Sequence, residues 1–142
     1  MSAMSLEEQL KAALEGINHQ YELARNQLFK HVEELSAAAQ SATNGAITLK
    51  LDTQNDDGEG RTFLLSVIER TDATVTKNGI MSYFVPLAGY PIHAGSAANV
   101  AKQPTVVISD SEQLARHFSD LASNKSSPVV VRLAYFLRSK SG

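Results

Sequence analysis

The chain has 142 residues, of which 43% are hydrophobic and 20% are charged, and it contains neither cysteine nor tryptophan. This length fits one domain with a buried core. The lack of cysteine excludes disulfide scaffolds, thiol catalysis and thiolate metal sites, and it favours a reducing compartment. No apolar run approaches the ~20 residues that a membrane-spanning helix needs, and the acidic N-terminus does not resemble a signal peptide. We therefore expect a globular cytoplasmic protein that does not bind membranes.

The charges are nearly balanced, since the sequence has 13 basic and 15 acidic residues. Proteins that bind nucleic acid through its phosphates carry clustered lysine and arginine. The only basic cluster in this sequence is Arg132, Arg138 and Lys140. We therefore expect no nucleic-acid partner.

Residues 5–42 have the periodicity of one long amphipathic helix. Ser5 and Glu8 have the spacing of a capping box at its start, and Asn44-Gly45 is typical of a helix end. Gly16 is unfavourable inside a helix, so either a continuous helix or one that kinks there is compatible with the sequence. Apolar side chains recur at steps of three and four residues, at Leu6, Leu10, Leu14, Ile17, Tyr21, Ala24, Leu28, Val32 (or His31), Leu35 and Ala38.

The length of this helix predicts self-association. At ~1.5 Å per residue it would be about 54 Å long, whereas a compact fold of the remaining chain would be about 35 Å across. The apolar positions also fit a heptad repeat, which is the pattern of paired helices. We predict an interface between copies of the chain at Leu14, Ile17, Tyr21, Leu28, His31 and Leu35. The alternative is a kinked helix that packs wholly within its own subunit.

After Gly45 the apolar period changes from that of a helix to that of strands. Residues 47–52 and 63–68 alternate as two strands, and the polar residues 53–60 between them predict a hairpin loop. The Asn78-Gly79 pair predicts a tight turn between strands 74–77 and 80–85, because it tolerates the positive φ angles of a type I′ turn.

The rest of the chain predicts a short strand at 105–108, a helix and a final strand. Leu114, His117 (or Phe118) and Leu121 would form the buried face of this helix, and residues 128–138 alternate as the final strand. The expected fold is α+β: a long N-terminal helix, a mainly antiparallel sheet of four or five strands, and one further helix before the last strand. We expect one domain over 1–142, with the sheet and second helix in 45–138.

The sequence holds no pattern that predicts catalysis or metal binding. Its four histidines do not form the i,i+3 or i,i+4 pair of a helical zinc site. Acidic residues crowd the segment 52–59, but a calcium loop counted from Asn55 would need glutamate where Ser66 stands. The acidic segment is therefore interpreted as a solvated hairpin tip, and we expect no metal, no cofactor and no catalytic residue.

The long connection 86–104 is the one candidate ligand site. Long loops often carry function, and this one brings together Tyr90, His93 and Ser96 among small residues. It lacks both a nucleophile motif and an acid that could orient the histidine.

The sequence thus favours a non-enzymatic protein-interaction module, of inhibitor, immunity or adaptor type, that forms homo-oligomers and binds an unidentified protein partner. The alternative is a small-molecule-binding or enzymatic domain with a pocket under the loop 86–104.

Overall fold

A computed structural model describes residues 4–95 and 104–141. All five strands form one antiparallel sheet in the order β1-β2-β3-β4-β5. The α+β class, the long N-terminal helix and the antiparallel sheet are confirmed. The elements in chain order are α1 (Leu6–Ala42), β1 (Ile47–Asp56), β2 (Gly60–Arg70), β3 (Val75–Pro86), β4 (Ile92–Gly95), β5 (Val106–Ile108), α2 (Ser111–Ser123) and α3 (Pro128–Ser141).

Helix α1 is one unbroken helix of 37 residues that contains Gly16. At its start the Ser5 hydroxyl accepts a hydrogen bond from the backbone N–H of Glu8 at 3.1 Å, as the capping spacing predicts. At its end Asn44 and Gly45 have φ angles of 55° and 85°, the left-handed conformation that a glycine adopts at little cost. The chain then turns directly into β1.

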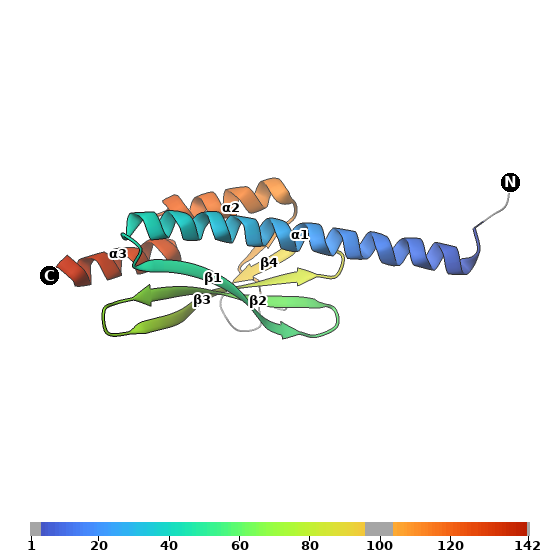
Figure 1. Cartoon of the computed structure of the whole chain (residues 1–142). Coiled ribbons are helices and arrows are strands. Elements are labelled where there is room, and N and C mark those ends of the chain that lie inside the picture. Colours follow the sequence, from blue (N-terminus) through green and yellow to red (C-terminus); the bar gives the residue numbers. More distant parts are fainter. Residues whose placement is uncertain (1–3, 96–103, 142) are drawn as a thin grey trace.

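One face of the sheet forms the core together with the C-terminal half of α1. Figure 1 shows α1 and α2 on the same side of the sheet. The strands contribute alternate apolar residues to this face, and α1 contributes one stripe at helical spacing. The buried residues include Ile47, Leu49, Leu51, Phe63, Leu65, Val67, Tyr83 and Val85 from the strands, and Ala24, Leu28, Val32, Leu35 and Ala39 from α1.

The predicted turn at Asn78-Gly79 is wrong, because both residues lie inside β3. The chain reverses instead at Thr71–Thr74, where the Thr71 N–H donates to the Thr74 carbonyl at 2.9 Å. Leu65 pairs with Met81 while Ser66 pairs with Gly79, so Ile80 is an extra residue in the β3 ladder, as in a β-bulge. A turn at Gly79 would have left β2 unpaired from Ser66 onward. Long-range strand pairing therefore outweighs the local turn preference.

The predicted last strand, 128–138, is also wrong, since this segment forms helix α3. The sheet is already complete at β5, so the second helix is followed by a third and not by a strand. Pro128 occupies the first helical position, and the Ser127 hydroxyl accepts from the Val130 N–H at 3.1 Å, which caps the helix. Val129 and Phe136 are buried and Leu133 packs half-buried against the core, at helical steps of four and three.

Leu28 and Leu14 provide a matched test of this packing, because they lie on one face of α1 in different surroundings. Leu28 is fully buried, whereas Leu14 is 56% exposed. We expect Leu28→Ala to lower the free energy of unfolding by about 2–5 kcal/mol. We expect Leu14→Ala to change it by less than about 0.5 kcal/mol at low protein concentration. Urea denaturation measures both values, and similar losses for the two variants would contradict the burial described here.

Candidate interaction surface

The N-terminal half of α1 extends beyond the rest of the molecule. Every residue from Met4 to Gln20 is exposed, and the first buried position of the helix is Ala24. Figure 1 shows this half of the helix extending past the end of the sheet, with no other element beside it. Residues 6–20 correspond to roughly 22 Å of helix.

This protruding segment carries large apolar side chains on one face. Leu6, Leu10, Leu14 and Ile17 are 83%, 61%, 56% and 42% exposed, and we call these four residues the exposed stripe. At 100° per residue they lie in line with Leu28 and the other α1 residues that pack on the sheet. One face of α1 thus has two environments: its C-terminal half is buried in the core, and its N-terminal half is in solvent.

The six predicted interface residues divide between these environments. Leu14 and Ile17 belong to the exposed stripe, and Tyr21 is half-buried at the boundary. Leu28 and Leu35 are buried within the chain's own core. His31 is half-buried, and its ring stacks on Phe118 at 5.3 Å. Of the six, only Leu14 and Ile17 are exposed to a partner. The prediction included buried residues because sequence periodicity does not reveal where the sheet ends beneath the helix.

At the boundary, the loop before β4 approaches α1 closely. Gly89 has a φ of 91°, and a Cβ atom there would lie 2.6 Å from the Gln20 carbonyl oxygen. The next residue, Tyr90, donates its hydroxyl hydrogen to Oε1 of Gln27 at 2.5 Å. These contacts hold the loop against one side of α1, beside the last turn before the buried half.

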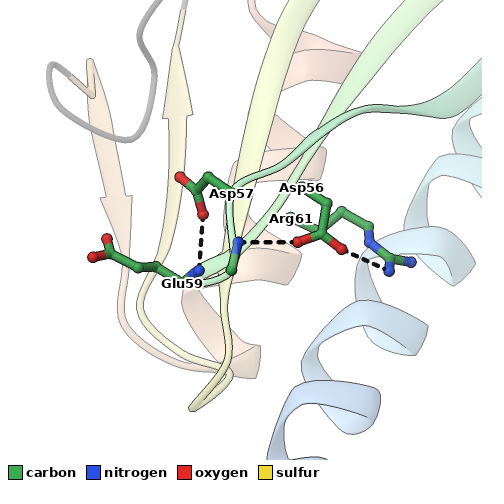
Figure 2. A network of polar contacts seen from close by, with 5 residues as sticks. Asp56, Asp57, Glu59 and Arg61 are labelled. Atoms are coloured by element: carbon green, nitrogen blue, oxygen red, sulfur yellow. Dashed lines mark hydrogen bonds and ion pairs between the residues drawn. The ribbon is translucent and has the colours of Figure 1, made fainter.

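The β1–β2 turn lies at the end of the sheet past which α1 extends (Figure 1), and its acidic side chains stabilise the turn itself. Figure 2 shows Asp56 accepting from the Gly58 N–H at 3.1 Å and Asp57 accepting from the Glu59 N–H at 2.9 Å. Arg61 donates to the second carboxylate oxygen of Asp56 at 3.0 Å. The Gly58 hydrogen bond, followed by that from Arg61, lowers the pKa of Asp56. The predicted hairpin is confirmed, but its loop is shorter than the predicted 53–60, since β1 continues to Asp56 and β2 begins at Gly60. Two of its carboxylates have structural roles in the turn.

Two residues of the predicted loop site, Tyr90 and His93, lie on different sides of the sheet. Tyr90 contacts α1 and, with Gln20, Leu23 and Ala88, lines a shallow groove of about 390 Å³. His93 lies in β4 between the inward-facing Ile92 and Ala94, and its ring lies 5.9 Å from that of Phe84. Its side chain is therefore on the opposite face of the sheet from α1. Ser96 lies outside the described residues.

The most perturbed titratable pair is in the core. The Tyr83 hydroxyl oxygen lies 2.6 Å from Nε2 of His117, and the two rings meet edge to face at 5.5 Å. Burial lowers the pKa of His117 to about 4, opposed in part by Asp120, and burial also raises the pKa of Tyr83. His117 is therefore uncharged at neutral pH. This pair joins β3 to α2.

Neither metal ligation nor membrane insertion is indicated by the described part of the chain. Across residues 4–95 and 104–141, no three His, Asp or Glu side chains gather closely enough to hold a metal ion. Within the same ranges, no helix is both long and apolar enough to cross a bilayer. Comparisons with protein-family models, with curated proteins and with solved structures found no match to this chain.

The lowered pKa of His117 predicts a pH dependence of stability. Between pH 6.5 and about pH 4 the unfolded chain binds a proton at this residue that the folded chain does not bind, so stability falls as the pH drops. The full loss attributable to His117 is at most about 3 kcal/mol. Replacing His117 with glutamine keeps a hydrogen-bonding group for Tyr83, and the glutamine side chain does not titrate. Urea denaturation of both proteins from pH 7 to pH 4 should show a shallower decline for H117Q, and parallel declines would contradict the assignment.

Proposed function

We propose that this chain is a non-enzymatic protein-interaction module that self-associates through the exposed stripe of α1. The observation that carries the proposal is the exposure of Leu6, Leu10, Leu14 and Ile17 on a helix that has already formed. Adjacent exposed apolar side chains on an otherwise soluble fold are typical of interaction sites. The absence of cysteine supports a cytoplasmic setting.

The exposed segment of α1 is suited to pairing with another helix. A free helix of this length would be marginal in water, but here it continues directly from a helix anchored in the core. The cost of ordering it is therefore met within the monomer. The contact is short, about two heptads, so we expect association in roughly the micromolar range and not an obligate dimer.

A small-molecule site under the loop remains the second candidate function, and the groove beside Tyr90 is its support. The groove volume is within the range of ligand pockets. Against it, the Tyr90 hydroxyl already bonds to Gln27, and His93 lies on the other face of the sheet. We therefore favour the interaction module, with an unidentified protein as a further partner.

The exposed stripe can be tested by introducing charge into it. We expect the double variant Leu10→Glu, Leu14→Glu to be monomeric at concentrations where the native chain approaches twice 15.3 kDa by light scattering. Two buried and unpaired carboxylates per subunit would cost more than so small a contact supplies. The thermal unfolding of the monomer should be nearly unchanged, because neither leucine belongs to the core.

Ala12→Glu is the matched control. Ala12 is exposed on the same segment but faces away from the stripe, so this variant should self-associate like the native chain. A native chain that stays monomeric up to about 100 µM would overturn the proposal. Equal loss of association in A12E would show that charge, and not the stripe, is responsible.

A further inference from the structure

We infer that two copies of this chain pair antiparallel through the exposed stripe. The two-fold axis passes between the two helices at the level of residue 12 along each helix. This inference rests on the proposed self-association and specifies its geometry. It follows from three observations: the face that the stripe shares with the core, the place where the sheet begins, and the charges along α1.

The first observation is that the exposed stripe and the buried stripe share one face of a single unbroken helix. A partner helix packed on the exposed stripe would have its axis about 8–10 Å from that of α1, on the same side as the chain's own sheet. In a parallel pair in register, the partner's helix would continue beneath Leu28 and Leu35. That space is filled by the strands that bury both leucines. A parallel pair would therefore collide with the sheet unless α1 bent, and α1 is continuous there.

An antiparallel pair avoids this collision. The N-terminal tip of the partner's helix then points toward the sheet of the first chain. The rest of the partner's helix runs away from that sheet, past the N-terminus of the first chain's α1. Ala24 is fully buried, so the tip must end near the level of Tyr21. Pairing Leu10 with the partner's Leu14 meets this limit, because residues whose numbers sum to about 24 then face each other. The partner's Leu6 lies close to the level of Ile17, and every residue of the stripe is covered.

The charges on α1 favour the same arrangement. Glu7 is exposed near the helix tip and flanks the stripe, so a parallel pair would place the two Glu7 carboxylates at one level. The antiparallel pair separates each Glu7 from its counterpart by about 15 Å along the axis. Each Lys11 keeps its contact with its own Glu7, at 3.2 Å.

The inference predicts unequal distances between spin labels at two equivalent helix positions. The chain has no cysteine, so Ala12→Cys and His19→Cys each create one labelling site. Both residues are exposed, lie off the stripe and are one heptad apart. In the antiparallel pair the two labels at position 12 have almost no axial offset, whereas those at position 19 are offset by about 21 Å.

Pulsed dipolar spectroscopy on the full-length labelled chains measures both distances. If the two labels are about 30 Å apart perpendicular to the helix axes, the distance between the labels at position 19 should exceed that between the labels at position 12 by roughly 7 Å. Equal distances would indicate a parallel pair and overturn this inference while leaving self-association intact. No dipolar coupling, together with a monomeric mass, would overturn both. Unlabelled A12C and H19C should have the native mass and unfolding transition, which excludes misfolding as a cause of either result.

Discussion

The packing of α1 on one face of the sheet is the contact on which the rest of the structure depends. Leu28, Val32 and Leu35 fill the space above Ile47, Leu49 and Phe63, and they do so from a helix whose opposite face is solvated. Burial of this size is the dominant favourable term in the folding of a small domain. The sheet could not bury its apolar face without the helix, and the helix gains its order from the same contact. α2 and α3 extend this layer.

The helix was the most predictable part of the molecule, and the reason is local. Its period, its cap at Ser5 and its end at Asn44-Gly45 are all determined by residues close in sequence. What the sequence did not show is that the apolar face of the helix divides near Tyr21 into buried and exposed halves. That division depends on how far the sheet reaches, which is a property of strands far along the chain, from Ile47 to Ile108.

The two errors of secondary structure have a common origin. Asn78-Gly79 is a strong turn signal, and the run Val129–Val131 is rich in β-branched residues, so local preference favoured a turn and a strand. In the fold, β2 pairs with β3 along its whole length, and within the described residues the sheet ends at β5, after which the chain forms two helices. Ser127 and Pro128, a capping residue followed by a proline, were the local signal for a helix that the alternating pattern obscured. Tyr90 and His93 lie apart for a related reason, since alternation along β4 turns His93 away from the face where Tyr90 lies.

The unbroken course of α1 through Gly16 also determines how far apart two associated copies would hold their sheets. A helix that bent at this glycine would let the folded bodies move independently, whereas a continuous one acts as a stiff spacer between them. A pair of such chains would present two identical surfaces at fixed separation and in opposite directions. Targets with matching spacing would be bound bivalently, and the gain in avidity would be lost for targets whose sites lie closer together or farther apart. The rigidity of one helix would thus select partners by their geometry as well as by their chemistry.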